Sequence, residues 1–188
     1  MKGIHKVRIQ NKRIQYEFEL RRNLTVIRGD SATGKTTLID MVQEHINNGD
    51  DSSIQLFCDK TCYVLEGATW EGQLSVMHDS IVFIDEGNPC IFTNEFSEAI
   101  QKTDKYYVIV SREGLPNLPY SVTEIYGIRS SGKYGSLKQH YHEFYRIYGE
   151  GNQPHISNRR NSSVGNVSSH DFSQTGLTEP GFSIPKTR

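Results

Sequence analysis

Residues 29–36 combine residue types and spacing that suit the binding of phosphate. Gly29 and Gly34 are separated by four residues, and Lys35 and Thr36 follow at once. An apolar run precedes this stretch, and apolar residues with helical spacing follow it. A glycine-containing turn between a buried strand and a helix presents backbone N–H groups to phosphate, at the helix end where the dipole favours negative charge. The stretch therefore predicts a site for the phosphates of a nucleotide.

Each part of this stretch has its own expected role. Gly29 and Gly34 permit backbone torsions and close approach that a Cβ would block. Lys35 is expected to reach the β- and γ-phosphates, and the hydroxyl of Thr36 to bind Mg²⁺. The full set of expected nucleotide-binding residues is Gly29, Asp30, Ser31, Ala32, Thr33, Gly34, Lys35, Thr36 and Thr37. The alternative is a glycine-containing turn with a chance Lys-Thr pair.

Two acids follow a second apolar run. Residues 80–84 are almost wholly apolar, and Asp85 and Glu86 come directly after them. Continuous hydrophobicity is typical of a strand covered on both faces, as in a parallel sheet. Open α/β sheets build their ligand sites at the carboxyl ends of such strands. The alternative is a strand that ends in a solvated acidic turn.

A third apolar run, residues 106–110, ends in Ser111 and Arg112. It predicts another buried strand whose polar end lies near the first two. The alternative is a strand that simply ends in a loop with an exposed arginine.

These motifs together resemble Walker A and Walker B of the P-loop NTPase superfamily, specifically its ATPase branch with a catalytic glutamate, the additional-strand class. The likeness covers about residues 22–112 and extends to small ATP-binding proteins of bacteria and their mobile elements. It implies that Asp85 holds Mg²⁺ and that Glu86 orients or deprotonates the attacking water. It also implies that Ser111 senses the γ-phosphate, and that Arg112 neutralises transition-state charge in cis or across an interface.

The chain departs from the named families of this superfamily. An LSGGQ-like signature is absent, and no switch histidine follows the third apolar run, where Ser111 and Arg112 stand instead. The Asn/Thr-Lys-x-Asp motif that reads guanine is also absent, which favours ATP over GTP.

The remaining pattern predicts the elements that position these residues. Alternating residues 4–10 and 14–20 predict an antiparallel hairpin, and helices are expected over 35–47 and 94–102. Short strands are expected over 54–58 and 61–65. Residues 122–129 and 134–137 flank a turn and predict a second hairpin, followed by a tyrosine-rich stretch expected to pack in the core. We therefore expect an α/β fold, a P-loop NTPase three-layer sandwich with a mostly parallel central sheet and an N-terminal antiparallel hairpin.

Composition divides the chain at about residue 150. Of the last 38 residues, 23 are Gly, Ser, Asn, Gln, Thr or Pro, with isolated apolar residues between them. Such a segment buries too little apolar surface to offset the entropy of ordering it. We expect a P-loop NTPase domain at 1–150 and a disordered polar tail or linker at 151–188.

Charge is unevenly distributed along the chain. Residues 1–28 carry a local charge of +6, and residues 38–105 a local charge of −10. The basic segment could bind nucleic acid or an acidic partner; the alternative is a charged, solvated hairpin that protects a sheet edge.

Three cysteines without a Cys-x-x-Cys pair indicate neither a disulfide framework nor a zinc site. With no apolar stretch near 18 residues, we expect no membrane association and a cytoplasmic location.

The leading functional hypothesis is Mg²⁺-dependent ATP binding and hydrolysis, coupled to a conformational change or a partner interaction. The small size of the chain suggests that a protein partner or self-assembly completes the site. Two alternatives stay open: a P-loop kinase of a small molecule or nucleotide, and a non-catalytic ATP-gated interaction module.

Overall fold

The computed structural model describes residues 3–30, 33–101, 103–131 and 139–148. These residues form three α-helices and nine strands. The helices are α1 (Lys35–Asn48), α2 (Trp70–Val76) and α3 (Asn94–Gln101). The strands are β1 (His5–Gln10), β2 (Ile14–Leu20), β3 (Leu24–Arg28), β4 (Gln55–Phe57), β5 (Cys62–Val64), β6 (Ile81–Ile84), β7 (Tyr106–Ser111), β8 (Ile125–Ser130) and β9 (His140–Arg146). The expected polar tail at 151–188 lies outside the described residues.

All nine strands belong to one sheet, in the order β4-β1-β2-β9-β8-β3-β7-β6-β5. The half from β8 to β5 is parallel throughout. In the other half, β1 pairs antiparallel with β2 and β4, and β9 pairs antiparallel with β8 but parallel with β2. The sheet is thus mixed, and the expectation of a mostly parallel sheet is wrong. The reason is that the N-terminal hairpin and β9 are hydrogen-bonded into the same sheet as β3, instead of forming a separate layer.

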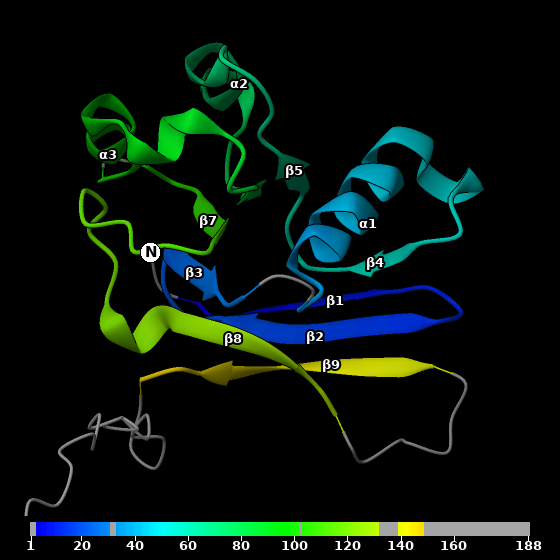
Figure 1. The fold of residues 1–188 in the computed structure, drawn as a ribbon. Coiled ribbons are helices and arrows are strands. Elements are labelled where there is room, and N and C mark those ends of the chain that lie inside the picture. The colour runs from blue at the N-terminus through cyan, green and yellow to red at the C-terminus, as the bar shows by residue number, and fades with distance from the viewer. Residues whose placement is uncertain (1–2, 31–32, 102, 132–138, 149–188) are drawn as a thin grey trace, which may run out of the picture. The chain divides into compact units, whose positions relative to one another are not determined.

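The sheet curls strongly (Figure 1). β4 and β5 stand at opposite ends of the strand order, yet only residues 58–61 separate them in sequence. Eight spacings of about 4.8 Å would hold the edges of a flat nine-stranded sheet about 38 Å apart. The five residue steps from β4 to β5 reach at most about 18 Å. We call residues 58–61 the β4–β5 strap.

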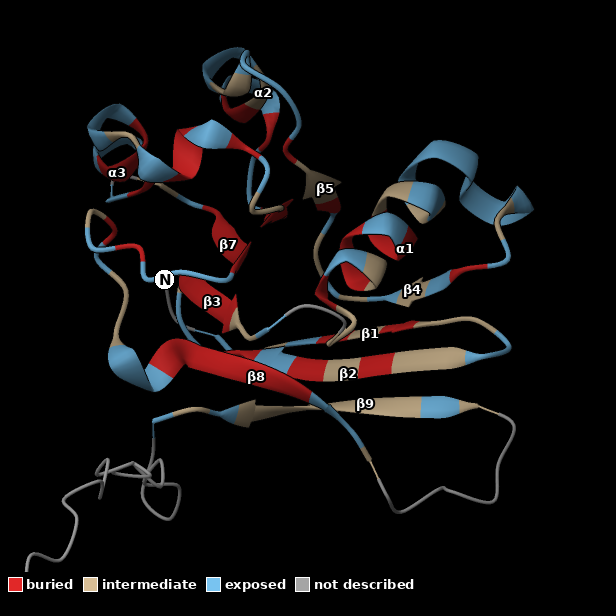
Figure 2. Cartoon of the chain, in the orientation of Figure 1, coloured by how far each residue is buried: buried red, intermediate tan, exposed pale blue. Residues whose placement is uncertain are grey.

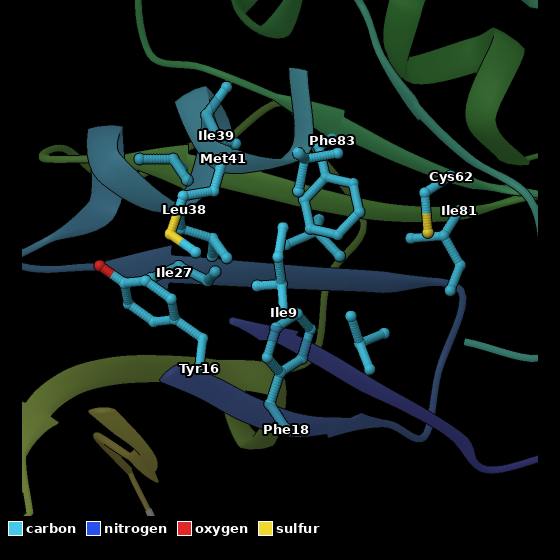
Figure 3. Close-up of a cluster of buried hydrophobic side chains, with 14 of the residues drawn as sticks. Ile9, Tyr16, Phe18, Ile27, Leu38, Ile39, Met41, Cys62, Ile81 and Phe83 are labelled. Carbon is cyan, nitrogen blue, oxygen red and sulfur yellow. The ribbon is translucent and has the colours of Figure 1, made fainter. Parts of the chain in front are cut away.

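Two apolar clusters cover the two faces of the parallel half, as the buried colouring of β3, β7 and β8 in Figure 2 reflects. Because successive residues of a strand face opposite sides, Phe83 and Val108 enter one cluster while Ile84 and Ile109 enter the other. The first cluster is completed by α1 and by the inward residues of β1 and β2 (Figure 3). The second is completed by residues of α2 and α3 and by the loop after β7. The α/β class is therefore confirmed, with the antiparallel half of the sheet and α1 together covering one face.

Helix α1 forms where the sequence predicts it. Leu38, Ile39, Met41 and Val42 are buried, so one stripe of the helix faces the sheet. The helix ends at Asn48, and Gly49, the residue after it, has a φ of 52° and donates its N–H to the carbonyl oxygen of His45. This stop lies one residue beyond the expected end.

The second hairpin differs from its expected form. β8 pairs antiparallel with β9, at residues 140–146, within the tyrosine-rich stretch. The expected strand at 134–137 lies outside the described residues. Phe144 of β9 packs against the core, and its ring stacks on Phe18 with centroids 4.3 Å apart.

Within the described residues, no helix combines the length and the apolar character needed to cross a membrane.

Candidate nucleotide site

Three parallel strands end at one edge of the sheet and carry the candidate residues there. Arg28 at the end of β3 pairs with Ser111 at the end of β7, and Ile84 of β6 pairs with Ile109 of β7. Gly29, Asp85 and Arg112 follow these strand ends directly. The structure therefore brings together the three segments that the sequence singles out.

The side chain of Lys35 folds back over the loop that precedes it. Its Nζ donates to the carbonyl oxygens of Gly29 and Asp30, both at 2.6 Å, and to Oγ1 of Thr33 at 3.1 Å. Burial is the largest effect on the pKa of this amine and lowers it. The charge of Arg112 lowers the pKa further, whereas the charge of Glu86 is the largest effect that raises it. The ammonium group thus sits within the loop, held by carbonyls that a bound phosphate could replace as its partners.

The first turn of α1 is open to an anion. Gly34 precedes the helix with a φ of 87°, and no side chain of the described residues caps this end. The first turn contains no acidic residue. Unpaired backbone N–H groups and the positive end of the dipole are therefore available there.

The two glycines of the loop differ in what they require. At Gly34 a Cβ would lie 2.7 Å from the hydroxyl of Tyr16, in addition to the strain of a positive φ, so the expected need for glycine is confirmed. At Gly29 a Cβ would meet Thr33 and Lys35 at ordinary contact distance, so the described residues do not themselves exclude a side chain there. A need for glycine at this position on close approach of a nucleotide stays a prediction.

The other expected loop residues differ in environment. Thr36 is exposed, and Thr37 is half-buried and slightly lowers the pKa of Tyr16. Thr33 donates to the carbonyl of Asp30 at 3.1 Å. Ser31 and Ala32 lie outside the described residues.

Asp85 carries a buried carboxylate oxygen, Oδ1, that has no hydrogen-bond partner among the described residues. Such an atom is costly unless a ligand or water satisfies it. No group of three or more His, Cys, Asp or Glu side chains in the described part of the chain could by itself hold a metal ion. Mg²⁺ in phosphate sites uses only one or two protein ligands and completes its shell with water and phosphate. Asp85 and Thr36 therefore fit Mg²⁺ held together with a nucleotide.

Glu86 and Arg112 form an ion pair, with Oε1 and Nε 2.8 Å apart. Glu86 is the more buried partner, with 26% of its side chain exposed against 59% for Arg112. The carboxylate expected to act on water is thus engaged by the arginine that follows β7.

Ser111 is buried, and its hydroxyl shapes the turn after β7. Oγ donates to the carbonyl of Glu113 at 2.9 Å and accepts from the N–H of the same residue at 3.1 Å. A sensor role for Ser111 stays a prediction, and it would require this hydroxyl to exchange partners.

Tyr16 and His142 lie behind the loop, and the sequence analysis did not assign them to the site. The hydroxyl of Tyr16 donates to the carbonyl of Gly34 at 2.8 Å. Burial raises the pKa of Tyr16 to about 12, against a smaller lowering by Thr37, so the phenol stays protonated and remains a donor. The ring of His142 stacks on Tyr16 with centroids 4.7 Å apart, and burial lowers its pKa. Only the alternation of β2, which points Tyr16 inward, hinted at this contact.

Several basic residues of the N-terminal segment are paired with acids. Lys6 contacts Glu17 at 2.5 Å, and Arg21 contacts Glu19 at 2.7 Å. Arg22 lies 3.9 Å from the buried Glu124. These pairs reduce the positive charge that the segment can offer to nucleic acid, as expected for a solvated hairpin.

Comparison with known proteins adds no assignment to this geometry. No protein-family model matches the chain, and no curated protein is significantly similar to it.

Proposed function

We propose that this chain is a Mg²⁺-dependent ATPase that couples nucleotide turnover to a conformational change or a partner interaction. The observation that carries the proposal is the convergence of Lys35, Asp85, Glu86 and Arg112 at the carboxyl ends of β3, β6 and β7. An ammonium group, an open helix N-terminus and two carboxylates at one sheet edge are the parts that phosphoryl chemistry needs.

The strand order supports the choice of ATPase class. β7 lies between β3, which leads into the phosphate loop, and β6, which leads to the acid pair. An extra strand at this place is the feature for which the additional-strand class is named. The order of the five strands β8-β3-β7-β6-β5 thus agrees with the likeness drawn from the motifs.

In the proposed reaction, each side chain has a separate task. Lys35 exchanges the carbonyls of Gly29 and Asp30 for phosphate oxygens, while Thr36 and Asp85 hold the magnesium ion that offsets phosphate charge. Glu86 accepts a proton from, or orients, the water that attacks the terminal phosphate. Because Arg112 holds Glu86, this pair must open first, and Arg112 is then free to face the charge that develops on the phosphates.

The test is a comparison of ATP binding and phosphate release in four proteins. Lys35→Ala is expected to lose nucleotide binding, whereas Glu86→Gln keeps binding and loses hydrolysis. Glu113→Gln is the matched control, since it neutralises an exposed acid close to Arg112 and is expected to behave as wild type. Equal phosphate release by wild type and Glu86→Gln would refute the role of Glu86, and undiminished ATP binding by Lys35→Ala would refute the site itself.

A further inference from the structure

Two of the three cysteines flank the β4–β5 strap. Cys58 is its first residue and is half-buried, and Cys62 begins β5 and is buried. Both sulfurs contact the backbone of Lys60: its N–H donates to Sγ of Cys58 at 3.5 Å, and Sγ of Cys62 donates to its carbonyl at 3.7 Å. Each thiol is also the largest influence on the pKa of the other. The two cysteines, four residues apart in sequence, therefore meet around Lys60 of the strap.

The strap that holds this pair is anchored on both sides. Asp59 binds Nδ1 of His5 in β1 at 2.7 Å, and Lys60 forms an ion pair with Asp79, which precedes β6. Lys60 also lies over the ring of Tyr106 in β7, 5.7 Å from its centroid. The strap thus connects the antiparallel half of the sheet to the parallel half, with the thiols fixed at its two ends.

A reagent can reach these thiols through a cavity of about 380 Å³ beside α1. Cys58 and Cys62 line it together with His45 and Ile46 of α1. The volume falls in the range of small-molecule sites. The half-buried Cys58 is the more accessible thiol, and Cys62 is buried.

We propose that Cys58 and Cys62 form a thiol–disulfide exchange site that reacts with low-molecular-mass disulfides. Cys58 is the attacking thiolate and Cys62 the resolving thiol. Transient disulfides of this kind are the form in which redox-sensing cysteines operate in reducing compartments.

The exchange runs in two balanced steps. The Cys58 thiolate attacks one sulfur of the small disulfide, a mixed disulfide forms, and one small thiolate leaves. Cys62 then loses its proton to water and attacks the Cys58 sulfur, so the Cys58–Cys62 bond forms and the bond from Cys58 to the small group breaks. The second small thiolate leaves, and both small thiolates take up protons from water. Two protein thiols are oxidised, and the reagent is reduced to two thiols.

The local chemistry supports this division of roles. The hydrogen bond from Cys62 is the largest effect that lowers the pKa of Cys58, to about 7, while burial, the charge of Asp59 and its hydrogen bond oppose it. The same contact, with burial, raises the pKa of Cys62. A thiol with a pKa near neutrality combines a substantial thiolate fraction with good nucleophilicity.

Cys90 provides the matched control within the same chain. It is buried in the other apolar cluster, and burial raises its pKa to about 11. It should therefore stay reduced under conditions that oxidise the pair.

The test is mass spectrometry of the full chain after treatment with oxidised glutathione. Wild type is expected to lose two hydrogen atoms and keep no glutathione, with a Cys58–Cys62 cross-link in the digest and Cys90 free. Cys62→Ser should accumulate a stable glutathione adduct on Cys58, because the resolving thiol is gone. Cys58→Ser should stay unmodified.

Two results would overturn the proposal. One is modification of Cys58 no faster than that of Cys90, and the other is loss of glutathione from Cys58 as readily in Cys62→Ser as in wild type. Neither reading depends on nucleotide, so failure here leaves the ATPase proposal standing. The thermal unfolding temperature of each variant, measured beforehand, ensures that the compared thiols belong to folded protein.

Discussion

At the scale of single residues, Tyr16 contacts the loop that precedes α1, although it lies outside the motifs that the sequence analysis singled out. Tyr16 donates its hydroxyl to the carbonyl of Gly34, which is the peptide just before Lys35. This bond fixes the last turn of the loop against β2. We infer that Tyr16 positions the loop without touching the nucleotide.

Tyr16→Phe is therefore expected to weaken nucleotide binding. Loss of one buried hydrogen bond costs about 1 kcal/mol of stability. If ATP binding must supply this 1 kcal/mol, about the stability lost, to order the loop in the variant, the affinity for ATP falls about fivefold. Calorimetric titration with ATP and Mg²⁺ measures this change.

Tyr107→Phe is the control for this prediction, because Tyr107 is equally buried and its hydroxyl bonds to Thr103, at the opposite end of β7 from the loop. It should lose similar stability and keep wild-type affinity. Equal losses of affinity in both variants would show a general effect of stability and remove the positioning role of Tyr16.

At the scale of elements, the close approach of β8 and β9 depends on a glycine. Gly127 of β8 stands directly opposite Tyr145 of β9. A Cβ on Gly127 would lie 2.5 Å from Cζ of Tyr145. The tyrosine ring thus occupies the space that a side chain at residue 127 would need.

Gly127→Ala should destabilise the protein by about 1–3 kcal/mol, the usual cost of overpacking. In a Tyr145→Ala background the same change should be neutral or stabilising, because alanine orders a strand at lower entropic cost than glycine. Denaturant unfolding of the four proteins gives the coupling energy. Equal effects of Gly127→Ala in both backgrounds would contradict the contact.

The elements also show how far sequence reasoning reaches. Alternation and apolar runs located β1, β2, β3, β6 and β7, and spacing located α1, because each signal is local and each element buries a face that its own residues define. The sequence did not predict strand β9, since its residues are half-buried and its parallel partner β2 lies more than 120 residues away. No local sequence pattern indicates a pairing over such a distance.

The same distinction applies to the candidate site. Gly29, Asp85 and Arg112 each follow a strand end directly, so the sequence placed them at one sheet edge. The Glu86–Arg112 pair, the contact of Tyr16 with Gly34 and the meeting of Cys58 with Cys62 depend on side-chain packing in three dimensions. Residue types and spacing predicted which polar residues meet at the strand ends, but not the side chains that contact them.

At the scale of the whole molecule, the curled sheet places its antiparallel half against the loop that precedes α1. Tyr16 of β2 bonds to the loop, and His142 of β9 stacks on Tyr16. Helix α1 shares its apolar cluster with β1, β2 and Cys62. Helices α2 and α3 belong to the other cluster, on the far face of the parallel strands. A change in the loop should therefore spread first into β2, β9 and α1.

Hydrogen exchange in the presence of ATP and Mg²⁺ tests this expectation. A ligand at 100 times its dissociation constant stabilises the folded state by about 2.7 kcal/mol. The amides that exchange through local opening should slow most in residues 29–48, and next in β2 and β9, while those of α3 change little. Lys35→Ala should show none of these effects. Protection confined to residues 29–48, with β2 and β9 unchanged, would show that the antiparallel half is a passive support. Protection of β2 and β9 that also requires the hydroxyl of Tyr16 would identify that half as the part of the molecule that responds to nucleotide.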